Sequence, residues 1–332
     1  MRLGLVGLGR IGAFHARTLL ALDVVDELVV TDALPAVTAA AVTELGVTAA
    51  DSPADLLAAG LDGVVIASST STHPELVLAF VEAGIPTFCE KPVAANLADA
   101  IAVRDKTAAF DVPVQIGFPR RFDPAMVRAR DDLQSGRLGK LHTLRSTTLD
   151  PAPPPAAYIA GSGGIFRDCA IHDFDTVRWA SGREVVEVYS AGTSRIIDYI
   201  AAAGDADTST SVLTLDDGAI AVVSNARRNG RGRDVRLELL GTEDSVAAGL
   251  DDTLPLRSAD PDVTFPAGPP AVFFIDRFAE AFRRELSTFT EVVASSAPSP
   301  CTVADGVEAS RIAEACTRSW QEHRPVRLDE ID

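Results

Sequence analysis

Cysteine is scarce in this sequence, and so are the positive charges that would balance its acidic residues. The 332 residues include 4 cysteines with no Cys-x-x-Cys spacing, which excludes a disulfide framework and favours a reducing, cytoplasmic setting. The 30 Lys and Arg residues face 47 Asp and Glu residues, so the formal net charge is −17. Because this charge repels nucleic acids and anionic membranes, we expect neither as a partner.

Long apolar runs are also missing. No stretch reaches the roughly 18 uncharged apolar residues of a membrane span, and the apolar run within residues 1–7 is too short for a signal peptide. We therefore expect a soluble protein that is not exported. Apolar residues make up 47% and charged residues 23%, which is ordinary globular usage, and the length favours about two domains.

Residues 1–118 alternate short apolar runs with helix-length segments. The expected strands are Leu3–Val6, Leu28–Thr31, Gly63–Ala67, Pro86–Cys89 and Val112–Ile116, and the expected helices lie near 10–22, 35–45, 73–84 and 96–110. Strands without polar alternation, separated by helices, are typical of a parallel sheet covered on both faces. This part of the chain is therefore predicted to be a doubly wound α/β domain of the Rossmann type.

Residues 119–332 have a different pattern, with prolines between longer strands that partly alternate. The expected strands are Val185–Thr193, Thr208–Leu215, Ala219–Ala226 and Asp234–Gly241, and the expected helices lie near 123–135, 170–181, 272–295 and 303–322. This pattern predicts a second, α+β domain built on one mixed or antiparallel sheet. The helix at 303–322 could pack back toward the first domain.

A glycine motif follows the first expected strand. Gly7, Gly9 and Gly12 form a Gly-x-Gly-x-x-Gly pattern, and Asp32 ends the second strand 20 residues later. Such glycines turn the chain, let the backbone approach a pyrophosphate and let helix and strand pack. A carboxylate at position 32 can accept both ribose hydroxyls and would repel a 2′-phosphate, which favours NAD over NADP. A turn that only packs a helix, or a flavin site, would show the same motif.

Lys91 stands in the sequence Glu90-Lys91-Pro92, directly after an expected strand. This places it at the carboxyl end of a parallel strand, which is the edge where such sheets bind ligands. A lysine there can polarise a substrate oxygen. The alternative is a solvated lysine at the end of a strand.

Asp168, His172 and Asp175 are spaced as i, i+4 and i+7, which would put them on one helix face. Two carboxylates beside an imidazole could orient it and raise its basicity, which suits removal of a proton from an alcohol. A metal site of His and Asp ligands is a second interpretation. A third is a helix N-terminus capped by Asp168, with His172 packed in the core. We expect no bound metal.

Longer segments extend these motifs over nearly the whole chain. They are Gly7–Gly12 with His15, Glu90-Lys91-Pro92-Val93-Ala94, Gly117-Phe118-Pro119-Arg120-Arg121-Phe122-Asp123, Asp150-Pro151-Ala152-Pro153-Pro154-Pro155, Gly163–Asp175, Phe273–Phe282 and Pro325-Val326. Together they resemble the Gfo/Idh/MocA oxidoreductases, and within that family the inositol 2-dehydrogenases. Glu-Lys-Pro marks the superfamily, whereas Arg-Arg-Phe-Asp and Asp-Pro-Ala-Pro-Pro-Pro are more specific to the inositol branch.

The resemblance implies hydride transfer from a secondary alcohol carbon to NAD. His172 would be the general base, Lys91 would hydrogen-bond the reacting oxygen, and Asp168 would bind a hydroxyl and orient His172. It also implies a cis peptide bond between Lys91 and Pro92, and a homotetramer assembled through the second-domain sheets.

The expected sites are therefore as follows. The cofactor site comprises Gly7, Gly9, Arg10, Ile11, Gly12, Asp32, Ser68, His73, Glu90 and Lys91. The substrate site comprises Arg121, Asp150, Asp168, His172, Asp175 and Arg233.

One region departs from the inositol enzymes. Arg231 and Arg233 stand where that branch is expected to have tyrosines, and Phe278 and Phe282 also replace tyrosines. If the two arginines reach the pocket, their donors suit an anionic group better than a neutral cyclitol; otherwise they face solvent in a turn.

The main hypothesis is an NAD-dependent dehydrogenase of myo-inositol or a related cyclic polyol. The alternative is a dehydrogenase, or a redox-neutral NAD-assisted glycosidase, that acts on a pyranose sugar, which could be anionic. A cofactor-binding sensor without turnover is a third hypothesis, but a sensor has no need of a base together with its orienting acid.

Overall fold

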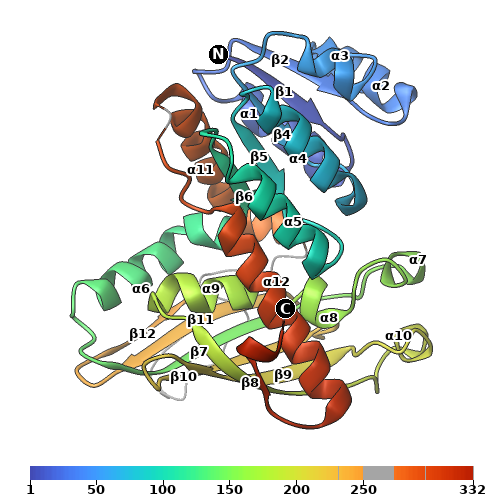
Figure 1. The fold of residues 1–332 in the computed structure, drawn as a ribbon. Helices are drawn as coiled ribbons and strands as arrows, with labels where there is room; N and C mark the ends of the chain where they lie inside the picture. Colours follow the sequence, from blue (N-terminus) through green and yellow to red (C-terminus); the bar gives the residue numbers. More distant parts are fainter. Residues whose placement is uncertain (231, 250–272, 296, 332) are drawn as a thin grey trace. The chain divides into compact units, whose positions relative to one another are not determined.

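The computed structural model describes residues 1–230, 232–249, 273–295 and 297–331. The described chain divides into two compact units (Figure 1). The first contains residues 1–119 and 280–308, and the second contains residues 120–279 and 309–332. The chain first passes from one unit to the other after Pro119, one residue from the expected boundary at 118.

The first unit is built on a parallel sheet whose six strands, among the described residues, run in the order β3-β2-β1-β4-β5-β6. The strands are β1 (Arg2–Val6), β2 (Glu27–Thr31), β3 (Thr48–Ala49), β4 (Gly63–Ile66), β5 (Thr87–Glu90) and β6 (Val114–Gly117). The helices are α1 (Arg10–Leu20), α2 (Pro35–Leu45), α3 (Pro53–Leu57), the 3₁₀ turn η1 (Thr70–Thr72), α4 (His73–Glu82) and α5 (Leu97–Thr107). The predicted Rossmann domain is confirmed, because this strand order is that of a doubly wound dinucleotide-binding sheet.

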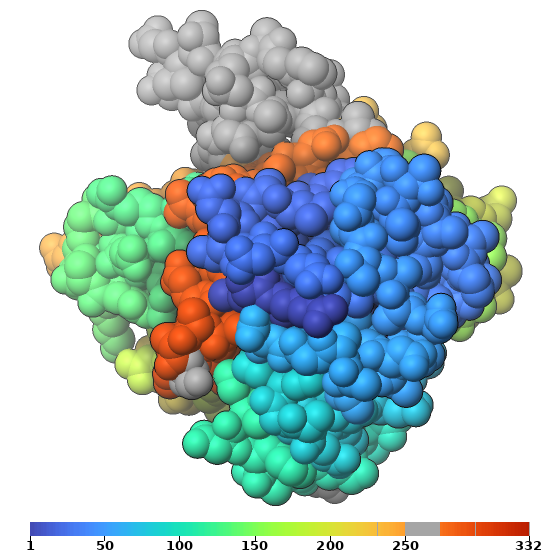
Figure 2. Space-filling model, turned by 90° about the horizontal axis from the view of Figure 1, so that it is seen from above, coloured from blue at the N-terminus to red at the C-terminus, as the bar shows by residue number. Residues whose placement is uncertain are grey.

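A later segment of the chain returns to complete this unit. Helix α11 (Phe274–Ser295) is kinked at Phe278, and its part from residue 280 onward belongs to the first unit. Phe289 meets the ring of Phe88 on β5 at 5.8 Å between centroids, and the Gln115 side chain donates to the Glu285 carbonyl oxygen at 3.1 Å. In Figure 2 the orange surface of this segment lies against the blue surface of the N-terminal residues.

The sequence-based domain division therefore differs from the structure over residues 280–308, which the prediction placed in the second domain, with only the helix at 303–322 expected to pack back toward the first. The physical reason is the apolar face of α11, since Leu286 and Phe289 are fully buried in the same cluster as Leu3, Leu5 and Phe88. Helix α12 (Val303–Glu322) is shared, with residues 303–308 in the first unit and 309–322 in the second.

The second unit contains a mixed sheet with the order β12-β11-β7-β10-β9-β8-β13 in the described part of the chain. Its strands are β7 (Leu141–Leu149), β8 (Val185–Thr193), β9 (Thr208–Leu215), β10 (Ile220–Ala226), β11 (Asp234–Gly241), β12 (Ser245–Ala248) and β13 (Val326–Arg327). Its helices are η2 (Pro119–Phe122, from residue 120), α6 (Pro124–Gln134), α7 (Ala156–Ile159), α8 (Ile165–Asp168), α9 (Ile171–Ser181), α10 (Asp198–Ala202), the first turns of α11, the later turns of α12, and η3 (Leu328–Glu330). The predicted α+β domain on one mixed sheet is confirmed.

Among the described residues, helices cover one face of this sheet and leave the other open. Helices α6, α9 and α12 lie on the covered face (Figure 1), where Trp320 of α12 donates to the Gly192 carbonyl oxygen at 3.0 Å. On the open face, Tyr189 and Val212 are paired residues of β8 and β9 and remain 48% and 41% exposed. No helix in the described ranges is long and apolar enough to cross a membrane.

Candidate active site

The glycine loop connects β1 to α1 and has the geometry that a pyrophosphate requires. Gly7 has a φ of +91°, and a Cβ there would lie 2.6 Å from the Cα of Ser68, while a Cβ on Gly12 would collide with the Gly7 carbonyl oxygen. Gly9 is different, because a Cβ built on it meets nothing within 4 Å. The chain itself therefore does not need a glycine at position 9, whereas a ligand lying on the N-terminus of α1 would. The residues present fit a dinucleotide.

Asp32 follows β2 and lies beside this loop. Its Oδ2 accepts a hydrogen bond from the Leu8 backbone N–H at 2.7 Å, and its Oδ1 accepts from the Leu34 N–H at 2.9 Å. These two bonds hold the carboxylate at the end of β2, next to the glycine turn. An acid fixed there is the group that distinguishes the ribose hydroxyls of NAD from the 2′-phosphate of NADP.

Ser68 and His73 follow β4, and the His73 ring lies between the Ser68 loop and the residues after β5. His73 is 1% exposed, with Nδ1 2.8 Å from the Pro92 carbonyl oxygen and Nε2 3.2 Å from the Ser68 carbonyl oxygen. Burial lowers the pKa of His73, so the ring is neutral near pH 7 and donates from one nitrogen, which the shorter distance assigns to Nδ1. The expected cofactor residue His73 is thus buried and ties the Ser68 loop to the peptide after Lys91.

Glu90 and Lys91 end β5 at the carboxyl edge of the sheet. The bond between Lys91 and Pro92 is cis, as the resemblance implied. The Glu90 carboxylate lies 2.6 Å from Nε2 of the fully buried His15, which comes from α1. The Lys91 side chain is half-buried. The structure therefore brings the glycine loop, Asp32, Ser68, Glu90 and Lys91 to one edge of the first unit.

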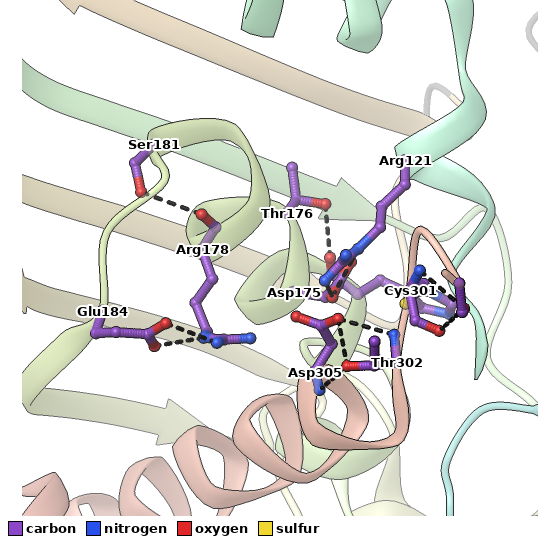
Figure 3. A network of polar contacts seen from close by, with 11 residues as sticks. Arg121, Asp175, Thr176, Arg178, Ser181, Glu184, Cys301, Thr302 and Asp305 are labelled. Atoms are coloured by element: carbon purple, nitrogen blue, oxygen red, sulfur yellow. Dashed lines mark hydrogen bonds and ion pairs between the residues drawn. The ribbon is translucent and has the colours of Figure 1, made fainter. Parts of the chain in front are cut away.

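The prediction that Asp168, His172 and Asp175 share one face of a single helix is wrong. Asp168 is the last residue of α8, and His172 and Asp175 belong to α9, because the helix is interrupted at Cys169 and Ala170. Asp175 is buried and takes part in a bidentate ion pair, in which the Arg121 Nη2 donates at 2.6 Å and its Nε at 3.0 Å (Figure 3). Farther along α9, Arg178 pairs with Glu184 at 2.7 Å. The first turn of α9 thus carries His172 beside an acid neutralised by Arg121.

Asp168 has two partners that the sequence did not reveal. The Tyr158 hydroxyl donates to its Oδ1 at 2.8 Å, and Nη1 of Arg227 donates to its Oδ2 at 2.8 Å. Arg227 is 1% exposed and also lies 3.4 Å from Asp205. A cation directly after the strand β10 is the only trace of this contact in the sequence.

Asp173, the residue after His172, forms a buried network that was also missed. Its carboxylate is fully buried and accepts hydrogen bonds from groups that come from η2, β7 and β10. The donors are Arg120 Nη1 at 2.7 Å, Ser146 Oγ at 2.5 Å, Thr148 Oγ1 at 2.8 Å and Asn225 Nδ2 at 2.7 Å. The start of α9 is therefore fixed to the sheet by the residue next to the predicted base.

Asp150 follows β7 and pairs with Arg233. The Arg233 Nη1 donates to Asp150 Oδ1 at 2.5 Å, and its guanidinium carbon lies 5.8 Å from the centre of the Phe274 ring. Because β7 and β10 are parallel and Leu149 is in register with Ala226, Asp150 and Arg227 leave the same edge of the second sheet. Arg231 lies outside the described residues.

The pKa of the buried Cys169 thiol reports that several of these charged side chains lie close together. Burial raises the pKa of Cys169 well above its usual range; Asp150, Asp173 and Asp168 raise it further, and Arg227 opposes them. Three carboxylates and one guanidinium therefore act on a single buried atom. Among the described residues, no group of three or more His, Cys, Asp or Glu side chains is placed to hold a metal ion.

A parallel sheet with a glycine loop, an acid after its second strand and a lysine at its carboxyl edge defines a dinucleotide-dependent oxidoreductase, and the comparisons agree. A family described as "Oxidoreductase family, NAD-binding Rossmann fold" matches residues 1–118, and the "GFO/IDH/MocA C-terminal domain" matches residues 126–247. The chain belongs to the Gfo/Idh/MocA oxidoreductase family, and its first domain is an NAD-binding Rossmann domain.

Several relatives are similar over their whole length. A myo-inositol 2-dehydrogenase from Thermotoga maritima is 38% identical, with 100% of this chain and 99% of the relative covered. The crystal structure of a myo-inositol dehydrogenase from Corynebacterium glutamicum has a TM-score of 0.91 at 35% identity, covering 99% and 98% of the two chains. A scyllo-inositol dehydrogenase from Lactobacillus casei, solved with bound NAD(H) and scyllo-inositol, has a TM-score of 0.89 at 26% identity and covers 99% of each chain.

Proposed function

We propose that the protein oxidises a secondary hydroxyl of myo-inositol or a related cyclic polyol, with NAD as the hydride acceptor. The observation that carries this proposal is a pair of carboxylates in the second unit: Asp150 directly follows β7, and Asp168 ends α8 and is bound by Arg227, which directly follows β10. Ionised carboxylates only accept hydrogen bonds, and a polyol presents several hydroxyl donors. The inositol dehydrogenases that match this chain along its whole length support the same substrate class.

The chemistry assigns one task to each side chain. Bound NAD would accept the hydride from the carbinol carbon. His172 removes the proton of the reacting hydroxyl, and Lys91 donates a hydrogen bond to the oxygen on which negative charge develops. Asp168 accepts a hydrogen bond from a substrate hydroxyl and favours the protonated imidazole as it forms. Gly7, Gly9, Gly12 and Asp32 would hold the dinucleotide.

The pairing of Arg233 argues against an anionic pyranose as the substrate. Its guanidinium is bound to the Asp150 carboxylate at 2.5 Å, so an acidic substrate would have to displace an existing partner. The pair as a whole is neutral, offers both a donor and an acceptor, and suits a neutral polyol. We therefore place the sugar-acid dehydrogenase and the NAD-assisted glycosidase second, and the sensor third.

We further propose a cytoplasmic homo-oligomer, a tetramer by family resemblance, assembled through the open face of the second sheet. Val212 is in register with Tyr189 and Val222 on its two neighbouring strands, which gives this face an apolar row. The four cysteines are buried free thiols, as suits a reducing compartment. The mass of the protein in solution tests the assembly.

A substrate screen tests the proposed function. The purified chain is incubated with NAD and a panel of inositols, pyranoses and sugar acids, and NADH is followed by its absorbance. We expect net NADH formation with at least one inositol isomer and a lower kcat/KM for sugar acids than for matched neutral sugars. Redox-neutral turnover of glycosides, or a preference for sugar acids, would move the assignment to the second hypothesis.

Asp32 should determine the choice of nicotinamide cofactor. Replacing Asp32 with alanine should lower the ratio of kcat/KM for NAD to that for NADP by about 10- to 150-fold, because one charged hydrogen-bonding group is worth about 1.5–3 kcal/mol. Asp32→Asn keeps an oxygen acceptor for the Leu8 N–H but removes the charge, so it should relax the repulsion of a 2′-phosphate with less damage to the loop. Asp23→Ala, at an exposed acid beyond α1, is the control. An unchanged ratio in both Asp32 variants contradicts the assignment.

A further inference from the structure

We propose that Arg227 is a positioning residue that keeps Asp168 ionised and correctly oriented for the oxidation. The inference rests on the proposed function for what Asp168 does, but the contact between the two side chains stands independently of it. Arg227 would not touch the substrate and would act only through the Asp168 carboxylate.

The geometry isolates Arg227 from solvent. Arg227 is the largest of the fully buried side chains in the described residues, with 1% of its surface exposed. Its backbone N–H donates to the Asp207 carbonyl oxygen at 2.8 Å. Its two terminal nitrogens diverge, one to Asp168 at 2.8 Å and one to Asp205 at 3.4 Å. The planar guanidinium therefore bridges two carboxylates, which a lysine could not do with the same geometry.

The two carboxylates at the ends of this bridge do different work. Asp205 Oδ1 accepts hydrogen bonds from the backbone N–H groups of Ile165 at 2.9 Å and Ala206 at 2.8 Å, so this acid fixes the start of α8. Asp168 ends the same short helix, is 15% exposed and also accepts from the Tyr158 hydroxyl. Because Asp205 is held by backbone N–H groups and also binds Arg227, Arg227 is held in place and in turn orients the Asp168 carboxylate.

The surrounding charges make a local cation necessary. Asp150, Asp168 and Asp173 all act on the Cys169 thiol, and Arg227 is the cation that opposes them there. Further polar or charged groups lie on the elements around Asp168. They include the Tyr158 hydroxyl on α7, which donates to Asp168, Asp205 before β9, which shares Arg227, Arg167 on α8, which pairs with Glu314 of α12, and His172 on α9. Removing Arg227 would take away the guanidinium that contacts both Asp168 and Asp205, which favours the protonated form of Asp168.

Because Asp168 in its protonated form no longer favours the imidazolium of His172, the proposal predicts a definite sign for pH-dependent measurements. Loss of an adjacent guanidinium raises the pKa of a carboxylate by about 1–3 units. In Arg227→Met the acid limb of the kcat/KM profile should therefore move upward by about 1–3 pH units. Asp205→Asn keeps the backbone caps through its amide oxygen but removes a competing negative charge, so its acid limb should move to lower pH. Arg227→Lys keeps the positive charge but cannot contact Asp168 and Asp205 with the same geometry. Its acid limb in the kcat/KM profile should stay at the wild-type pH, while its kcat falls.

A measurement without turnover separates this inference from the proposed function. Carboxyl ¹³C NMR of aspartate-labelled full-length protein, with the Asp168 resonance assigned through Asp168→Asn, reports the ionisation of Asp168 directly. We expect its titration to move upward in Arg227→Met and downward in Asp205→Asn. An inactive wild-type protein would refute the proposed function, and the titration would still decide the role of Arg227. If Arg227→Met does not fold, Asp205→Asn and Arg227→Lys decide it: an unchanged titration in Asp205→Asn, or an upward one in Arg227→Lys, overturns the proposal.

Discussion

Replacing His172 with alanine should lower kcat by about 10²–10⁴-fold while NAD binding stays close to that of the wild type. The size of the effect is the usual contribution of a positioned general base. The selectivity follows from the fold, because His172 lies on α9 of the second unit, whereas the glycine loop and Asp32 belong to the first. Steady-state kinetics with the inositol identified by the screen give kcat, and titration with NAD gives the dissociation constant.

The exposed His142 on β7 provides the matched control, since His142→Ala removes an imidazole from the same unit without touching α9. A His172→Ala enzyme that keeps a near wild-type kcat would contradict the role of base. A variant in which both kcat and the melting temperature fall would instead favour the alternative interpretation of the sequence, in which His172 is packed in the core.

The first unit could be predicted from sequence because its determinants are local. Each central strand of that sheet is a short run of buried apolar residues, and Gly7, Gly9 and Gly12 act through the backbone of their own turn. The miss in the second unit has a physical cause. Strand β7 was not predicted from the sequence, because two of its four buried residues are polar: Leu141 and Leu144 are apolar, whereas Ser146 and Thr148 are not. The usual apolar alternation is therefore hidden.

The substrate end of the site was less predictable because its contacts join distant residues. Arg227 and Asp168 are 59 positions apart, and Arg120 and Asp173 are 53 apart. The regular spacing of Asp168, His172 and Asp175 was misleading, since Asp168 ends α8 whereas His172 and Asp175 belong to α9. The start of α8 is held by Asp205, a contact between residues 40 positions apart. Sequence could place acids near His172, but it could not say which arginine would neutralise each one.

Asp173→Ala should destabilise the protein by about 3–5 kcal/mol, which is the usual loss when one partner of a buried ion pair is removed. The substitution leaves the Arg120 guanidinium, 4% exposed, without its carboxylate, and it also removes the acceptor for Ser146, Thr148 and Asn225. Urea unfolding of the wild type and the variant measures the difference. Asp216→Ala, at an exposed turn residue, should change the free energy of unfolding by less than about 0.5 kcal/mol.

A double variant identifies the origin of this loss. If most of it comes from the charge left on Arg120, then replacing Arg120 with methionine in the Asp173→Ala background should recover part of the stability, because an apolar side chain avoids the buried, unpaired cation. A double variant as unstable as the sum of the two single changes would show instead that the Ser146, Thr148 and Asn225 contacts dominate. In either case the residue beside the predicted base would anchor α9 to the sheet, so we expect variants that fold to lose kcat more than they raise KM, since a base displaced by about 1 Å costs rate before it costs binding.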